Sequence, residues 1–235
     1  MKRVFGAMLL LVLAVATFGC NQQGSGGSAG LALGSAPWQD GDKISYNWLD
    51  KNGNQAGTTE VTFAKDGEAW AMTWADKIGG LEQTETVRMD ALTLKPLSNA
   101  KTIKQQGSDV TVDATYHNGK LDIKAVVNGE NKTASVDVPA DALDNGQLLM
   151  TLRALPFADG YEGKFVNVVS QNASKISTTV RVQDQEQVTV PAGTFTAWKV
   201  QLDFGQAKQT AWYQTDGAHN LLQYDNGTTK LVLVK

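Results

Sequence analysis

The sequence predicts an all-β domain with one short helix, built as a large curved antiparallel sheet. Apolar and polar residues alternate through most of residues 37–235, which is the period of a half-buried strand. Asn-Gly and Asp-Gly pairs such as Asn118-Gly119 and Asp66-Gly67 separate these runs. Both pairs tolerate the positive φ angles that tight hairpin turns require. Consecutive hairpins with one polar face favour a half-barrel or an open barrel.

The first nineteen residues have the pattern of a signal peptide. Lys2 and Arg3 precede an apolar run over residues 4–18 that is shorter than the roughly 20 residues needed to span a bilayer. Gly19 then precedes Cys20, the one cysteine of the chain. This arrangement resembles a bacterial lipoprotein signal, which implies cleavage before Cys20 and attachment of acyl chains to that residue. A plain secretory signal or a retained membrane anchor are the alternatives, but the former would leave an unpaired thiol on an exported protein.

The segment after the cysteine is rich in Gly, Ser and Gln, so residues 20–36 are expected to form a lipidated cysteine followed by a flexible tether. Residues 37–235 then form a single β domain, long enough to bury a core without disulfides. The expected location is the bacterial cell envelope. In a Gram-negative host we expect the outer membrane, with the domain facing the periplasm, because Asn21 is not the aspartate that marks inner-membrane retention in enteric bacteria.

Individual strands are expected where apolar residues share one face. These sets are Ile44, Tyr46 and Trp48; Val61 and Phe63; Trp70, Met72 and Trp74; Val110, Val112, Ala114 and Tyr116; Leu121, Ile123, Ala125 and Val127; Ala134, Val136 and Val138; Val166 and Val168; Val180 and Val182; Trp198, Val200, Leu202 and Phe204; Tyr213; Leu222 and Tyr224; Leu231 and Leu233.

One stretch, residues 140–157, has helical rather than strand periodicity. Leu148, Leu152 and Leu155 are spaced for one face of a short amphipathic helix, which Pro156 would end. Asp144 or Asn145 is the expected N-cap residue. The helix would lie against the concave face of the sheet, where it either fills a solid core or covers a ligand cavity.

The composition argues against several function classes. The formal net charge is −3, and loss of Lys2 and Arg3 with the signal peptide lowers it to −5, so nucleic acid is not an expected partner. His117 and His219 have no second histidine at metal-ligand spacing, and no phosphate-binding glycine loop or nucleophile elbow occurs. We therefore expect no metal, no cofactor and no catalytic residue. A hydrolase that uses two carboxylates from distant strands remains the less favoured alternative.

The C-terminal third carries a specific string of residues. "VTVPAGTFTAWKVQLDF" (188–204) is followed by "TAWYQTDGAHNLLQYD" (210–225), with "LPFADGYEGKF" (155–165) and "DALTLKPLS" (90–98) upstream. The chain resembles an uncharacterised family of bacterial envelope lipoproteins, catalogued only as a domain of unknown function. That family is similar in architecture to the lipoprotein-localisation half-barrels. The resemblance implies about ten strands wrapped round helices, with an apolar concavity that holds acyl chains.

These observations together indicate a non-catalytic envelope protein, bound to its membrane through the lipid anchor on Cys20. The leading hypothesis is that it binds an apolar ligand, such as a lipid or an acyl chain, in the half-barrel. The candidate ligand-facing residues are Trp48, Trp70, Trp74, Leu148, Leu152, Phe157 and Trp198. The alternative is a structural or interaction module with a solid core, which docks a protein partner of the envelope.

Overall fold

The computed structural model describes residues 30–234; the expected signal peptide and Cys20 lie outside the described residues. Fifteen strands form one sheet, and all neighbouring strands are antiparallel except β9 and β10. The strands are β1 (Lys43–Leu49), β2 (Gln55–Asp66), β3 (Ala69–Ile78), β4 (Leu81–Asp90), β5 (Pro96–Gln105), β6 (Ser108–His117), β7 (Lys120–Val127), β8 (Glu130–Asp137), β9 (Ala142–Asp144), β10 (Glu162–Val169), β11 (Ser174–Val190), β12 (Gly193–Asp203), β13 (Lys208–Gln214), β14 (Leu221–Asp225) and β15 (Lys230–Leu233).

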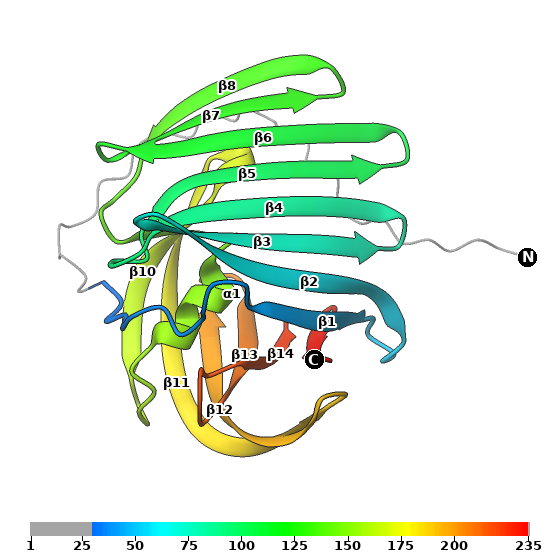
Figure 1. Ribbon diagram of the computed structural model, residues 1–235, viewed down its shortest axis with the longest axis vertical. Coiled ribbons are helices and arrows are strands. Elements are labelled where there is room, and N and C mark those ends of the chain that lie inside the picture. Colours follow the sequence, from blue (N-terminus) through cyan, green and yellow to red (C-terminus); the bar gives the residue numbers. More distant parts are fainter. Residues whose placement is uncertain (1–29, 235) are drawn as a thin grey trace, which may run out of the picture.

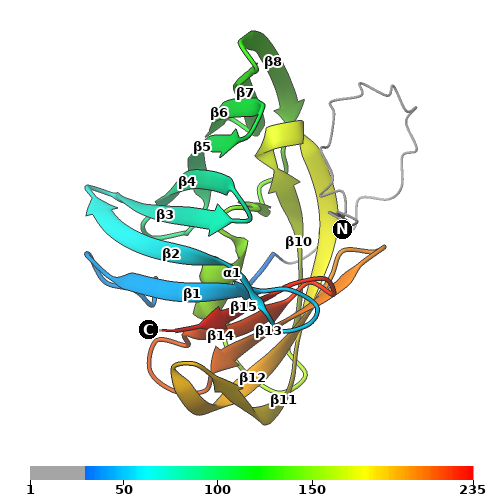
Figure 2. The ribbon, with the colours of Figure 1, turned by 90° about the vertical axis from the view of Figure 1, so that its right-hand side faces the viewer.

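The sheet consists of two meanders joined in its middle. Its order is β8-β7-β6-β5-β4-β3-β2-β1-β15-β14-β13-β12-β11-β10-β9, so β1 pairs with β15 at the centre and β8 and β9 are the free edges. The sheet curls round its interior, and the two edges approach each other without a backbone ladder between them (Figures 1 and 2). The expected curved, open antiparallel sheet is confirmed, with more strands than the roughly ten that the resemblance implied.

Two Asn-Gly pairs form the expected tight hairpin turns. Asn118 and Gly119 have φ angles of 47° and 74°, and Asn128 and Gly129 have φ angles of 51° and 86°. These pairs connect β6 to β7 and β7 to β8. The pair at residues 145–146 differs, because it leads from β9 into a helix instead of joining two strands.

The expected helix is present, but it is not amphipathic. It comprises α1 (Leu148–Thr151) and the 3₁₀ turn η1 (Leu152–Ala154), and its residues are buried apart from the half-buried Leu149. It lies inside the curl of the sheet (Figures 1 and 2), so it meets protein on almost every side. The predicted N-cap was wrong, because Asp144 belongs to β9 and binds elsewhere. Gln147 occupies the cap position and makes no capping hydrogen bond; its side chain donates to the Leu94 carbonyl and to the Thr151 hydroxyl instead.

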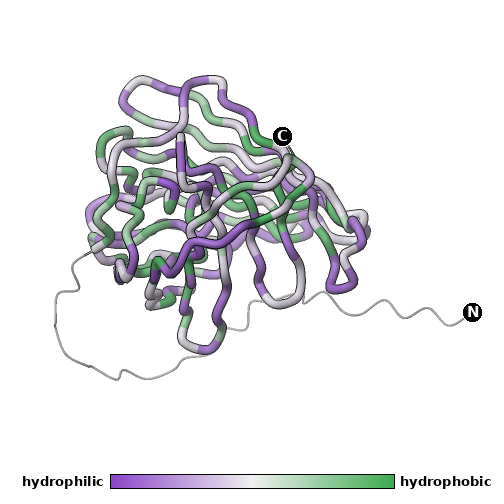
Figure 3. Tube along the Cα trace, turned by 90° about the horizontal axis from the view of Figure 1, so that it is seen from below, coloured by the Kyte–Doolittle hydropathy of each residue, from purple (hydrophilic) through white to green (hydrophobic). Residues whose placement is uncertain are grey.

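The core consists of two clusters. The larger one gathers inward residues of β1–β4 and β10–β15 around the helix, and the smaller one joins β6 and β7 to β9 and β10. Hydrophobic and hydrophilic stretches alternate along the chain in Figure 3, as expected for strands with one buried face. Strand β10 is an exception, since Phe165 contacts the larger cluster while Val168, on its other face, contacts the smaller one.

The last part of the expected tether belongs to the domain. Leu31 and Leu33 pack against the larger core cluster. The Gly34 backbone N–H donates to the Ala154 carbonyl at 2.8 Å, and the Ala32 N–H donates to the Tyr161 hydroxyl at 3.1 Å. The folded domain therefore begins before residue 37.

Candidate ligand-binding strip and polar seam

The seven candidate ligand-facing residues all join the larger core cluster, but at different depths. Trp70, Trp74, Leu148 and Leu152 have exposed fractions of only 9, 8, 3 and 0%. Trp38 stacks on Phe63 at 4.8 Å between ring centroids and meets Trp70 edge-on at 6.2 Å. These deep positions are thus filled by the protein's own side chains, as expected for a packed core.

The other three candidates lie closer to the surface. Phe157 stacks on Trp198 at 6.5 Å and tilts against Tyr213 at 5.5 Å and His219 at 4.5 Å. This group anchors the segment that follows η1 to strands β12 and β13. Trp48 lies apart from it on β1, near the open end of the concave face, and is half-buried.

An apolar strip extends from Trp48 across the concave face. Each of its residues lies an even number of positions from the buried inward residues of its own strand. Because side chains in a strand change face at every residue, the strip residues also point inward. Register pairs join Ile78 to Leu81, Ile103 to Val110 and Val110 to Val127. All are half-buried, which leaves part of each side chain free for contact. We call this set the mouth strip: Trp48, Ile78, Leu81, Ile103, Val110 and Val127.

Gly57 makes room beside the first residue of the mouth strip. It pairs with Trp48 across β1 and β2 and with Ile78 across β2 and β3. A Cβ atom at Gly57 would lie 2.3 Å from the Lys77 carbonyl oxygen and 2.8 Å from Ile78. A larger residue would therefore push strand β3 away from β2.

A polar seam joins the inner side of β4–β6 to the opposite edge of the sheet. Asp144, on β9, accepts hydrogen bonds from Asn99 Nδ2 at 2.7 Å, the Tyr116 hydroxyl at 2.6 Å and the Gly146 N–H at 2.8 Å. Asn99 Nδ2 also donates to Glu85 Oε1 at 2.8 Å. Side chains rather than a backbone ladder thus hold the β9 edge against the inner face of β5 and β6.

An ion pair extends the seam toward the mouth strip. Lys101 Nζ lies 2.9 Å from Glu85 Oε2, and each side chain is only 8% exposed. Lys101 Nζ also donates to Gln171 Oε1 at 2.6 Å, and Gln171 lies on the 3₁₀ turn η2 (Ser170–Asn172). Gly146 allows this packing, because a Cβ atom there would lie 2.5 Å from Glu85 Oε1. We define the polar seam as Glu85, Asn99, Lys101, Tyr116, Asp144 and Gln171.

A second buried carboxylate lies beside Trp48. Asp76 accepts a hydrogen bond from the Thr59 hydroxyl and one from Gln83 Nε2, and Trp48 Nε1 donates to the Thr59 oxygen at 2.6 Å. Burial raises the pKa of Asp76, and the Thr59 hydrogen bond opposes that shift. The polar side chains of Thr59, Asp76 and Gln83 therefore lie next to the Trp48 end of the mouth strip.

Glu85 and Asp144 are the two seam carboxylates that bear on the hydrolase alternative. Glu85 and Asp144 share Asn99, and burial raises the pKa of Asp144, with the Tyr116 hydrogen bond opposing it. However, their residues are 6% and 0% exposed, and both carboxylates are held by Asn99. This arrangement favours a structural role over contact with a substrate.

Residues 30–234 contain no group of three or more His, Cys, Asp or Glu side chains placed to hold a metal ion. His117 instead contacts Asp122 at 2.6 Å on the outside of the sheet, and His219 Nδ1 lies 2.9 Å from the Gln214 carbonyl. Within the same residues, no helix is long and apolar enough to cross a membrane.

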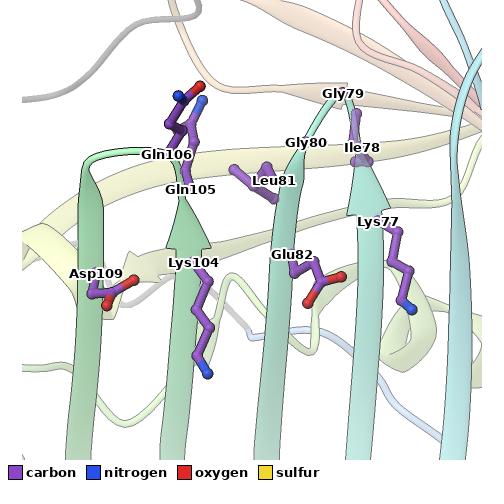
Figure 4. A pocket seen from close by; sticks show the side chains of 10 residues that line it. All are labelled: Lys77, Ile78, Gly79, Gly80, Leu81, Glu82, Lys104, Gln105, Gln106 and Asp109. Atoms are coloured by element: carbon purple, nitrogen blue, oxygen red, sulfur yellow. The ribbon is translucent and has the colours of Figure 1, made fainter.

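A hollow of about 470 Å³ lies between the tips of the β3–β4 and β5–β6 hairpins. Figure 4 shows Ile78 and Leu81 on one hairpin, with Lys104 and Asp109 on the other. The hollow is open to solvent and mostly polar, and it shares Ile78 and Leu81 with the mouth strip. It therefore adjoins the end of the strip, but Lys77, Glu82, Lys104 and Asp109 belong to the outward rows of their strands.

One solved structure supports the fold, and two others are reported with lower similarity. A β-barrel-like protein of the domain of unknown function DUF1849 from Brucella abortus is similar with a TM-score of 0.51 at 14% identity, over 82% of this chain and 95% of that one. A candidate lipoprotein from Parabacteroides distasonis aligns with a TM-score of 0.32 at 11% identity, covering 86% and 98% of the two chains. A candidate exported protein with a YmcC-like fold from Bacteroides fragilis gives 0.32 at 10% identity, covering 87% and 99%.

No curated protein matches this chain. A family described as "Protein of unknown function (DUF3108)" matches residues 43–231, which extend from the first strand to the last. The match includes the Pro-Ala-Gly-Thr-Phe turn between β11 and β12 and both sides of the polar seam. The chain therefore belongs to the DUF3108 family, an uncharacterised family whose domain here is a large open β half-barrel.

Proposed function

We propose that this chain is a lipid-anchored, non-catalytic protein of the bacterial cell envelope that binds the acyl chain of a lipid along the mouth strip. The supporting observation is the strip itself: a row of half-buried apolar side chains on the concave face, paired in register within β3–β4 and within β5–β7, with Gln83 opposite Ile103 between the two parts. Apolar side chains arranged in a concave surface are the usual lining of a lipid site.

The mouth strip suits an acyl chain better than the deep core does. A ligand at Trp70, Trp74 or Leu152 would have to displace side chains that are already packed together. A chain lying on the strip would cover the exposed parts of its residues, at about 25 cal/mol per Å² of apolar surface removed from water. The half-buried Gln83, which lies opposite Ile103, borders the strip and could hydrogen-bond a polar headgroup.

The anchor and the location rest on the sequence. Acyl chains on Cys20 would hold the domain near its membrane, since each buried methylene contributes about 0.8 kcal/mol. We propose the outer membrane, with the domain facing the periplasm, for a Gram-negative host. Lipid in that membrane would then be within reach of the mouth strip.

Native mass spectrometry of residues 21–235, purified without detergent, tests the lipid proposal. We expect a bound species that solvent extraction removes and identifies as a lipid. Val127→Glu should abolish it by placing a charge in the strip, whereas Val126→Glu should not. Val126 is the matched control because it adjoins Val127 on β7, faces outward and is 37% exposed. An apo mass for the unmodified protein, or equal loss in both variants, would contradict the proposal.

A second candidate function is docking of an envelope protein on the free edge of β8. Within the described residues β8 has a partner strand on one side only, and most of its residues are exposed. Such an edge can pair with an extended segment of another chain. Asn131→Pro on that edge should weaken crosslinking to a partner while leaving lipid binding unchanged, which separates the two functions.

A further inference from the structure

Arg153 is a buried cation, and one of its guanidinium nitrogens has no hydrogen-bond partner in the described part of the chain. It lies on η1 and is 2% exposed. Its Nε and Nη2 atoms donate to the Ala218 carbonyl at 3.1 and 3.0 Å, and Nη2 also donates to Asn220 Oδ1 at 2.8 Å. These bonds tie the helix to the turn between β13 and β14. Nη1 is buried and has no hydrogen-bond acceptor in the described part of the chain.

Two further donors near Arg153 are in the same situation. The Tyr46 hydroxyl and Trp38 Nε1 are buried without a hydrogen-bond partner, in residues that are 1% and 3% exposed. The Arg153 guanidinium carbon lies 5.9 Å from the Trp38 ring centroid and 5.9 Å from that of Phe63. Burial raises the pKa of Tyr46, and the charge of Arg153 opposes this shift. The three donors thus lie in one neighbourhood, on β1, on the segment before it and on η1.

The partner that these groups lack must accept hydrogen bonds, because a guanidinium and an indole N–H can only donate. No carboxylate of residues 30–234 contacts Arg153 as an ion pair, and the charge of Asp42 acts on it only from a distance. A buried charge without a counter-charge in contact is costly. A water molecule could satisfy the hydrogen bonds, but it would place no negative charge against the guanidinium, so an anion suits the site better.

We propose that Arg153, Tyr46 and Trp38 hold one small inorganic anion of the halide class inside the half-barrel. The anion balances the guanidinium and links the helix to β1 and to the segment before it. The surroundings favour a monatomic ion, because Phe63 and Tyr213 enclose the neighbourhood with 1% and 0% exposure. The site is independent of the mouth strip and of the lipid proposal.

Thermal unfolding of the mature full-length chain tests the site, with bromide replacing gluconate at constant ionic strength. We expect Tm to rise by about 5 °C once bromide is about thirtyfold above its Kd. Tyr46→Phe removes one donor and preserves packing, so it should shift this response to roughly tenfold higher bromide. Tyr224→Phe is the matched control, since the Tyr224 hydroxyl donates to Gln209 and should not affect the response.

A crystal grown in bromide gives a second, direct readout. An anomalous peak within hydrogen-bond distance of Arg153 Nη1 would confirm the site. The proposal is overturned if the position holds only water, or if unmodified protein and Tyr46→Phe respond equally to bromide. The proposal is also overturned if neither protein responds to bromide and Tyr46→Phe is merely more stable than the unmodified protein.

Discussion

Replacement of Lys101 by methionine should destabilise the domain strongly, because it leaves Glu85 charged and buried. Lys101 and Glu85 are each 8% exposed and lie 2.9 Å apart, and Lys101 also holds Gln171 across the seam. Removing one member of a buried ion pair costs about 3–5 kcal/mol. For a domain of this size each kcal/mol lowers Tm by about 2–4 °C, so the expected loss is roughly 6–20 °C.

Urea unfolding followed by tryptophan fluorescence measures this loss at neutral pH. Lys43→Met is the control, because the Lys43–Glu60 pair has side chains 58% and 41% exposed and should cost only a small fraction as much. Adding Glu85→Gln to Lys101→Met should recover part of the stability by removing the uncompensated charge. Equal costs for Lys101→Met and Lys43→Met would refute the reasoning, since the seam would then be open to water.

Three other predictions follow from the seam and the anchor. The raised pKa of Asp144 gives stability that is present below its ordinary value of 3.8 and is lost as pH rises through the raised value; Asp144→Asn should therefore have a flatter profile of Tm against pH, and parallel profiles would contradict this. Gly146→Ala should cost about 1–3 kcal/mol in urea unfolding by crowding Glu85, whereas Gly34→Ala should be nearly neutral because its Cβ would lie 3.5 Å from the nearest atom. Cys20→Ser should move the protein from the membrane fraction to the soluble fraction, with no acyl mass on the N-terminal peptide.

The general architecture could be predicted because most strands have apolar inward residues and tight turns between them. Trp70, Met72 and Trp74 alternate with less buried residues on β3, and Asn118-Gly119 adopts the positive φ angles that its hairpin requires. Binary alternation and turn chemistry are local properties, so they can be read without knowing which strands are neighbours.

Strands β4 and β5 could not be identified in the same way, because several of their inward residues are polar. Gln83 and Glu85 on β4, and Asn99 and Lys101 on β5, occupy positions where alternation predicts apolar side chains. Gln83 binds Asp76 on the neighbouring β3, whereas Asn99 and Lys101 bind groups on β9 and η2, which are distant in sequence. The inward positions at which polar residues replace the expected apolar ones are therefore the positions that form or border the polar seam.

The helix region shows a similar limit. Helical spacing gave the position of α1 correctly, but the interpretation of Asp144 as a cap was wrong because a tertiary partner, Tyr116, competes for its carboxylate. Strand β9 has three residues, too few for a period to be recognised. Nothing in the local pattern distinguishes Arg153 from an ordinary polar residue beside leucines; its burial near Trp38, Tyr46 and Phe63 does.

The pairing of β1 with β15 has a consequence for the order in which the domain folds. Tyr46 pairs with Leu233, so the first strand to be synthesised depends on the last one, with nearly the whole described chain between them. Contacts between such distant residues form slowly, because a long loop must close first. For a chain exported as proposed above, the hairpins of each meander can form as the chain emerges from the membrane, but the two halves cannot join until β15 has crossed. Until then β1 is an open edge, and a chaperone that shields extended strands would be most useful during this interval.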